Sequence, residues 1–121
     1  MSKTALTIDD SKTMRDMVAF TLKNAGFDVT EADNGQTGLD KVKGSSFDVI
    51  ITDVNMPVMD GITFTREARK CAGARTTPIL ILTTESGSSL KNDGRSAGAT
   101  GWIVKPFNPE KLLQVVEKVC G

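Results

Sequence analysis

Reactive or charged side chains follow apolar stretches at four places along this chain. They are the acidic pair Asp9-Asp10, the carboxylate of Asp53, the hydroxyl of Thr83 and the ammonium of Lys105. Clustered carboxylates repel one another unless a cation holds them, and hard oxygen ligands favour Mg²⁺ or Mn²⁺. A carboxylate nucleophile with a divalent ion, a hydroxyl and a lysine can accept a phosphoryl group, because the cations neutralise charge on the transferred oxygens. This chemistry requires a fold that brings the residues together.

The stretch before Asp53 is the clearest element in the sequence. Residues 47–52 form a nearly uninterrupted apolar and β-branched run, typical of a strand buried on both faces of a parallel sheet. Asp53 follows where this strand ends, and Met56-Pro57 breaks the extended structure. Further strands are expected at residues 4–9, 27–32, 79–83 and 102–104. Every strand except the second therefore ends on one of the chemical groups.

Helical segments alternate with these strands. The first helix is expected to begin after an N-cap at Asp10 or Ser11 and to be stopped by Gly26. Further helices are expected at residues 35–44, 61–72 and 88–98, and a last one begins at Pro109, behind an Asn108 N-cap. The first helix is predicted to turn these apolar residues inward: Met14, Met17, Val18, Leu22 and Ala25. The last is predicted to bury Leu112, Leu113, Val116, Val119 and Cys120. The fourth is predicted to be short and marginally stable, because glycine, serine and asparagine are frequent there.

Alternation of this kind predicts an α/β fold, with a doubly wound five-stranded parallel sheet and helices on both faces. The chain of 121 residues fits one domain covering residues 1–121, with no output domain. The carboxyl ends of parallel strands open on one edge of the sheet, where such folds bind ligands. If the first and third strands are neighbours, three carboxylates converge there, from Asp9, Asp10 and Asp53.

Composition excludes several other functions. Fifteen basic and fifteen acidic residues give zero net charge, which argues against a nucleic-acid partner or a polybasic membrane contact. The N-terminal residues lack the long apolar core of a signal peptide, and the longest apolar runs have the length of strands, so a cytoplasmic protein is expected. The chain has no histidine, which excludes Ser-His-Asp chemistry and the commonest zinc ligand. It also cannot carry a phosphohistidine, so any phosphoryl group that it accepts must come from a partner. Cys71 and Cys120 are predicted to be buried thiols.

The motifs at the strand ends resemble those of response-regulator receiver domains, and more narrowly the stand-alone receivers of chemotaxis. They are the acid pair, the D-x-N-M-P-x-M-D-G stretch at 53–61, the strand ending in Thr83 and the K-P-F stretch at 105–107. The resemblance covers the whole length of the chain. It implies strand order 2-1-3-4-5 and a protein that is phosphorylated by a histidine kinase.

The resemblance also implies a role for each site residue. Asp53 is expected to be the phosphoacceptor, and Asp10 and Asp53 to bind Mg²⁺ together with the backbone carbonyl of Asn55, while Asp9 helps through water. Thr83 is expected to hydrogen-bond the phosphoryl group, and Lys105 to pair with it; movement of Thr83 toward that group is expected to act as a switch by pulling on the helix at 88–98. The Lys105-Pro106 bond is expected to be cis. Receiver domains catalyse their own phosphorylation and dephosphorylation without being conventional enzymes.

Three further residues bear on turnover and switching. Asn55 and Glu85 match the polar pair of chemotaxis receivers, so a short-lived acyl phosphate is expected. Trp102 stands where the family usually has a Tyr or Phe that swings inward on activation; it is either such a switch or an exposed edge-strand aromatic packed on the fourth helix. The surface near it carries four basic residues, Lys91, Arg95, Lys111 and Lys118. Expected partners of this monomer are a histidine kinase, a target such as the flagellar motor switch, and a phosphatase.

Other readings of the same residues remain open. The domain can act as a phosphate sink or phosphorelay intermediate, or as a protein-binding module that is not phosphorylated. An aspartyl phosphatase is disfavoured because Asn55 stands where those enzymes place a second acid. Flavodoxin-like nucleotide binding is disfavoured because the acid pair would repel a phosphate. The remaining turn acids are interpreted as solvated: Asp28, Asp33, Asp48 and Asp60.

Overall fold

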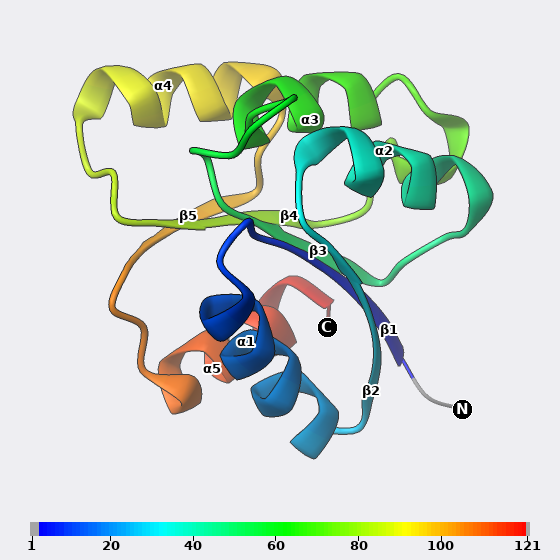
Figure 1. Cartoon of the computed structure of the whole chain (residues 1–121), viewed down its shortest axis with the longest axis vertical. Helices are drawn as coiled ribbons and strands as arrows, with labels where there is room; N and C mark the ends of the chain where they lie inside the picture. Colours follow the sequence, from blue (N-terminus) through cyan, green and yellow to red (C-terminus); the bar gives the residue numbers. More distant parts are fainter. Residues whose placement is uncertain (1–2, 121) are drawn as a thin grey trace.

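The computed structural model describes residues 3–120, and within them five parallel strands form one sheet. The strands are β1 (Lys3–Ile8), β2 (Phe27–Ala32), β3 (Val49–Thr52), β4 (Ile79–Thr83) and β5 (Gly101–Val104). Their order across the sheet is β2-β1-β3-β4-β5, which confirms the predicted topology (Figure 1). Two register pairs matter for the site: Ile8 lies opposite Thr52, and Thr83 lies opposite Val104. The residues that follow these strands therefore meet at one edge.

Helices cover both faces of the sheet, as predicted (Figure 1). The α1 (Lys12–Asn24) and α5 (Pro109–Cys120) helices pack on one face. The opposite face carries α2 (Gly35–Gly44), α3 (Gly61–Ala68) and α4 (Ser88–Ala97). A short 3₁₀ helix, η1 (Ala72–Ala74), lies between α3 and β4. Within the part of the chain that is described, no helix has the length and apolarity needed to cross a bilayer.

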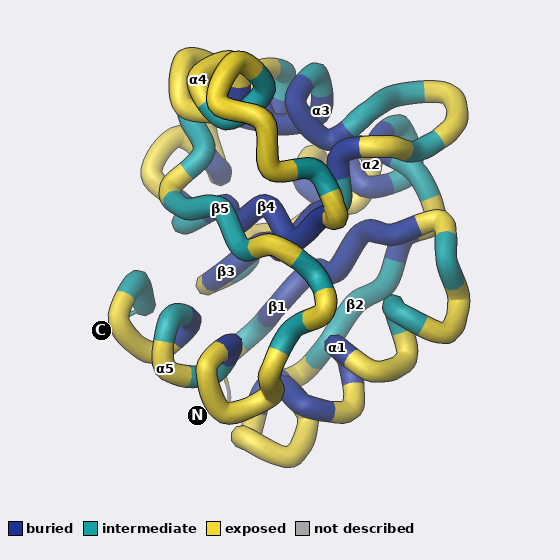
Figure 2. The backbone as a smooth tube through the Cα atoms, turned by 90° about the vertical axis from the view of Figure 1, so that its left-hand side faces the viewer, coloured by how far each residue is buried: buried dark blue, intermediate teal, exposed yellow. Residues whose placement is uncertain are grey.

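The central strands form the core, because both faces of a sandwiched sheet are removed from water. All of β3 and β4 is buried, while the helices keep an exposed outer side (Figure 2). One apolar layer joins β-strand side chains to α1 and α5, through residues such as Leu22 and Val116. A second joins them to α2 and α3, through residues such as Leu39 and Phe64. A rigid sheet between two packed layers thus supports the edge where the polar residues lie.

Side-chain caps set where four helices begin. Ser11, and not Asp10, caps α1 by accepting a hydrogen bond from the Met14 amide. Asn34 caps α2, which was not predicted, and Asn108 accepts from the first amides of α5, which was. The fourth cap is Asp60, which was interpreted as a solvated turn acid; its carboxylate instead accepts from the amide and hydroxyl of Thr63 at the start of α3.

The prediction for the first helix was wrong at two of its inward positions. Met17 is 47% exposed, and Ala25 lies beyond the end of α1 as its C-cap. The buried residues are Val18, Ala19, Thr21 and Leu22. One residue corresponds to about 100° of rotation on a helix, so an apolar residue beside the inward stripe can still face water. In α5, Leu112 and Val116 are buried, and the other three predicted residues are partly buried.

The third helix is shorter than predicted and ends at Ala68. Its last turn tightens, because the amides of Lys70 and Cys71 bond carbonyls three residues back. The guanidinium of Arg69 donates to the carbonyls of Ala74, Thr77 and Gly98, which holds the chain in a loop. Cys71 therefore lies outside the helix. It and Cys120 are free, half-buried thiols, less buried than predicted.

Smaller differences concern the strands. The central strand begins at Val49 and not at Phe47, which lies half-buried before it. Asp28 is an exposed residue within β2 and not a turn acid. Asp48 accepts hydrogen bonds from the amide and hydroxyl of Thr4, so it ties the start of β1 to the chain before β3.

Candidate functional site

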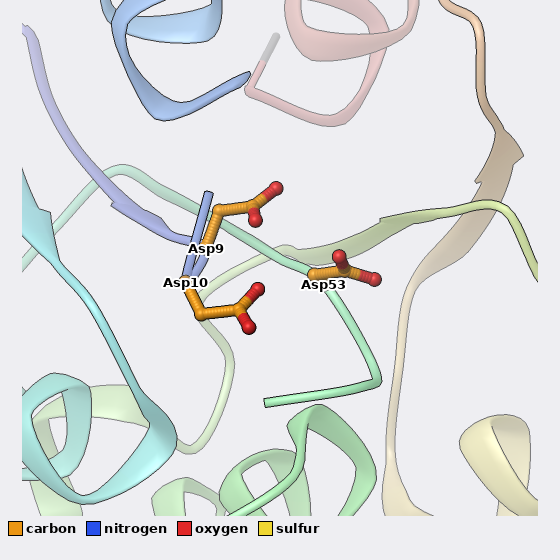
Figure 3. A group of neighbouring side chains, drawn as sticks. All are labelled: Asp9, Asp10 and Asp53. Atoms are coloured by element: carbon orange, nitrogen blue, oxygen red, sulfur yellow. The ribbon is translucent and has the colours of Figure 1, made fainter. Parts of the chain in front are cut away.

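Three carboxylates converge at the carboxyl edge of the sheet. Asp9 and Asp10 follow β1, and Asp53 follows β3, which is its neighbour in the sheet. One oxygen from each side chain lies within 4.8 Å of the others, and Figure 3 shows the three groups together. The amide of Asp53 donates to the carbonyl of Ile8, so the β1–β3 pairing continues up to the acids. The convergence predicted from the alternation of elements is therefore present.

The two adjacent acids lie in different environments. Asp9 is 5% exposed, and its amide donates to the carbonyl of Ala32 at 3.1 Å. Its carboxylate accepts from the Ser11 amide at 2.9 Å and from Lys105 Nζ at 2.9 Å. Asp10 is exposed, and its carboxylate has no hydrogen-bond partner among residues 3–120. Asp9 is thus buried and held by hydrogen bonds, whereas Asp10 is the solvent-exposed acid of the site.

Lys105 links the two sides of the site. Its Nζ lies 2.9 Å from Asp9 Oδ2 and 3.0 Å from Asp53 Oδ2, and its side chain is only 10% exposed. Burial disfavours the charged ammonium, but the bonds to Asp9 and Asp53 outweigh burial and raise the pKa of Lys105 above its ordinary value. The Lys105-Pro106 peptide is cis, as the resemblance implied. One ammonium against three carboxylates leaves an excess of negative charge.

Asp53 is held by the backbone around it. Its Oδ1 accepts from the Val54 amide at 2.6 Å, and its carbonyl accepts from the Thr52 hydroxyl at 2.9 Å. The β3–α3 loop folds back so closely that a Cβ at Gly61 would overlap the Asp53 carbonyl. The Gly61 amide also donates to the Val54 carbonyl at 2.9 Å. A glycine is needed at the start of α3 because the backbone itself forms this side of the site.

Glu85 connects the residues predicted to tune and switch the site. Its side chain accepts from the Asn55 amide group at 3.0 Å, and its backbone carbonyl accepts from the Trp102 indole at 2.9 Å. Its own amide donates to Thr83 Oγ1 at 3.4 Å. Thr83 is fully buried at the end of β4. The structure therefore brings all four residues together around the β4–α4 loop, beside the carboxylates.

Two arginines escaped the sequence reasoning. Arg69 anchors a loop through backbone carbonyls, a role that no local pattern indicates. Arg15 Nη1 donates to the Asp9 carbonyl at 2.7 Å, and its Nε lies 3.1 Å from Glu31 Oε1. The one sequence signal that could have indicated Arg15 is its position, as a cation in the first turn of a helix that follows an acid pair.

The donor set fits a hard divalent cation. Three carboxylates lie close enough to share one ion, the Asp10 carboxylate has no competing bond within residues 3–120, and the local charge is negative. Oxygen-only ligands with an open side are typical of Mg²⁺ or Mn²⁺ and not of zinc.

Comparison with known proteins decides the family. The model of the response regulator receiver domain matches residues 5–117. The chain belongs to the response regulator receiver domain family. It is 37% identical over 118 residues to the chemotaxis protein CheY1 of Helicobacter pylori, covering 96% of this chain and 95% of that protein. It is 36% identical to the chemotaxis protein CheY of Pseudomonas aeruginosa over 115 residues, covering 94% of this chain and 93% of that protein.

Solved receiver structures agree with the fold throughout. The chemotaxis response regulator CheY4 of Vibrio cholerae has a TM-score of 0.93 and 47% identity, covering 98% of this chain and 99% of that one. The receiver domain of the Pseudomonas aeruginosa sensor histidine kinase PA1611 has a TM-score of 0.93 and 25% identity, covering 100% and 99%. That structure carries a magnesium ion coordinated in its active-site cleft. The recognition made from the sequence motifs is confirmed.

Proposed function

We propose that this receiver domain is a phosphorylation-activated response regulator in which Asp53 accepts a phosphoryl group from the phosphohistidine of a histidine kinase. The observation that carries the proposal is the Lys105 ammonium, which lies within 3.0 Å of both Asp9 and Asp53 at the open edge of the sheet. A lysine fixed on the acceptor carboxylate is placed to meet the charge that a phosphoryl group brings. The single receiver domain is proposed to cover the chain, in keeping with the family match over residues 5–117.

The proposed reaction uses the groups at the ends of four strands, β1, β3, β4 and β5. A carboxylate oxygen of Asp53 attacks phosphorus, the bond from phosphorus to the imidazole nitrogen breaks, and its electron pair leaves with the imidazole. Lys105 then pairs with a phosphoryl oxygen, and the Thr83 hydroxyl donates to another. Asp10, Asp53 and the backbone carbonyl of Asn55 would hold Mg²⁺, with Asp9 helping through water. When bound, the ion would supply positive charge that stabilises the negative charge of the phosphoryl oxygens.

The acyl phosphate is proposed to be short-lived. The Asn55 and Glu85 side chains bond each other at 3.0 Å, and Asn55 follows the acceptor by two residues, so this polar pair is proposed to assist a water that attacks the phosphoryl group on Asp53. The domain would in this way catalyse its own dephosphorylation. A half-life of hours for the phosphorylated protein in the presence of Mg²⁺ would contradict this part of the proposal.

Output is proposed to pass through Trp102. Its indole donates a hydrogen bond to the Glu85 carbonyl, so movement of the β4–α4 loop toward a phosphoryl group would also move Trp102 on β5. Two surface hollows of about 350 and 360 Å³ share this tryptophan, one against Lys91 and Arg95 and one against α5. Since the relatives are chemotaxis proteins, a chemotaxis target such as the flagellar motor switch is the proposed partner. A phosphate sink or relay is the alternative.

The test is phosphorylation by a small acyl phosphate with Mg²⁺, followed by intact mass and by Trp102 fluorescence. The wild-type protein is expected to gain the mass of one phosphoryl group and to change its fluorescence. Neither change is expected in Asp53→Asn or after removal of Mg²⁺ with EDTA. The matched control is Asp28→Asn, an exposed carboxylate on β2 that leaves the site intact. A mass gain that persists in Asp53→Asn would place the acceptor elsewhere.

A further inference from the structure

Arg15 joins three elements at the back of the acid pair. It lies in the first turn of α1, its Nη1 donates to the Asp9 carbonyl at 2.7 Å, and its Nε pairs with Glu31 on β2 at 3.1 Å. Its side chain is 16% exposed, so the contacts lie largely out of solvent. The Asp9 amide bonds the carbonyl of Ala32, which is the next residue after Glu31. The turn between β1 and α1 is therefore clamped to β2 at two points.

The accepting carbonyl has a particular place in the chain. It belongs to the peptide unit that connects Asp9 to Asp10, and a peptide unit is planar. A hydrogen bond to this oxygen therefore fixes the plane from which the Asp10 side chain departs. Asp9 is already held by Ser11 and Lys105, whereas the Asp10 carboxylate has no partner among residues 3–120. Arg15 therefore holds the peptide unit that immediately precedes the Asp10 side chain.

We propose that Arg15, oriented by Glu31, is a positioning residue of the metal site, which holds the Asp9–Asp10 peptide so that the Asp10 carboxylate faces the ion. This inference rests on the proposed function of the site. A guanidinium suits the task because its planar fork can bind the Glu31 carboxylate and the Asp9 carbonyl at the same time. A lysine has the charge but presents one nitrogen on a flexible stem.

The positive charge of Arg15 is expected to change metal affinity in the direction opposite to its positioning role. A cation this close to the acids repels a metal ion, so its removal by charge alone would tighten metal binding. Loss of positioning would weaken binding, because mutation of residues that orient metal ligands typically costs about tenfold to a hundredfold in affinity. The direction of the change therefore separates the two roles.

The experiment measures Mn²⁺ binding by electron paramagnetic resonance and Mg²⁺ binding by calorimetry, in wild type, Arg15→Gln and Arg15→Lys. Both variants are expected to weaken binding by about tenfold or more. The matched control is Lys12→Gln, which removes a charge from the same end of α1, where the Lys12 ammonium pairs with Asp16. It is expected to keep the wild-type affinity. Unchanged or tighter binding in Arg15→Gln, or wild-type affinity in Arg15→Lys, would overturn the proposal.

A second readout does not depend on the metal. The ¹³C carbonyl resonance of Asp9 in the metal-free protein reports its charged hydrogen bond, and it is expected to move in both Arg15 variants and not in Lys12→Gln. Thermal unfolding in EDTA identifies a variant that fails to fold, in which case the comparison rests on the conservative Arg15→Lys. A wild-type protein that binds neither Mn²⁺ nor Mg²⁺ would overturn the proposed metal site itself, which is a different failure from equal binding in all variants. An unmoved Asp9 resonance would also refute the role of Arg15.

Discussion

Lys105 Nζ lies 3.0 Å from Asp53 Oδ2, although the two residues are 52 positions apart in the chain. The same ammonium bonds Asp9, which is 96 positions away. Contacts over such separations form only when the whole sheet is assembled, because β1, β3 and β5 must each end at the same edge. The ion pairs of Lys105 are therefore a sensitive report on the integrity of the site.

Alkaline pH is expected to weaken the fold through Lys105. Its pKa is raised in the folded protein because the bonds to Asp9 and Asp53 outweigh burial. A raised pKa stabilises the fold fully below the unfolded value of about 10.4, and this contribution is lost as the pH rises through the folded value. Asp53→Asn removes one partner and should lower the pKa of Lys105. Titration of the Lys105 ¹³Cε resonance measures both values, and an identical titration in the variant would refute the ion pair.

Asp10→Asn is expected to stabilise the protein without Mg²⁺ while it removes the stabilisation that Mg²⁺ provides. The exposed Asp10 carboxylate adds repulsion beside two other acids, so its removal should raise the free energy of unfolding by about 1 kcal/mol. An ion that binds only the folded state stabilises it by mass action, and this term should vanish. Urea unfolding with and without Mg²⁺ measures both effects. Asp28→Asn is the control, and full Mg²⁺ stabilisation in Asp10→Asn would remove this acid from the metal site.

Val58→Asn is expected to raise the free energy of unfolding by roughly 1 kcal/mol. Val58 has φ of 71°, a left-handed conformation that a β-branched residue rarely adopts and that asparagine tolerates. The side chain is 81% exposed, so little packing is lost on substitution. The midpoint of urea unfolding checks the gain. Val58→Thr keeps the branched Cβ and is the matched control; an equal gain in Val58→Thr would show that the backbone is not the cause.

Gly94→Ala is expected to displace the Trp102 indole. A Cβ at Gly94 would lie 2.9 Å from Trp102 Cζ3 and 3.2 Å from Ile81 Cδ1, so the ring must move and its bond to Glu85 weakens. The fluorescence emission should shift toward that of a solvated tryptophan. Replacing glycine by alanine in a helix raises the free energy of unfolding by about 1 kcal/mol, and overpacking against the indole should cancel this gain. Gly44→Ala, which meets no neighbour within 4 Å, should keep its gain as the control. Unaltered emission in Gly94→Ala would contradict the packing.

Local patterns predicted most of the elements correctly. The apolar run before Asp53 became β3, and the Asn108-Pro109 sequence opened α5, because strand burial and helix capping depend on a few neighbouring residues. The start of α3 at Gly61 was predicted correctly, but its end was missed, for the converse reason. Its end at Ala68 is set by Arg69, which bonds Ala74 and Thr77 in the loop that follows and Gly98, which is 29 positions away, so it depends on how the loop and the end of α4 pack.

The sequence by itself determined which chemical groups reach the edge of the sheet, since strand and helix periods place Asp9, Asp53 and Lys105 directly after strands. Only the tertiary structure decided how these groups are used. It buried Asp9 and left Asp10 open, and it set Arg15 behind the peptide between them. The physical reason is that periodicity depends on residues a few positions apart, whereas hydrogen bonds and burial depend on side chains that meet only after the sheet and its helices have packed.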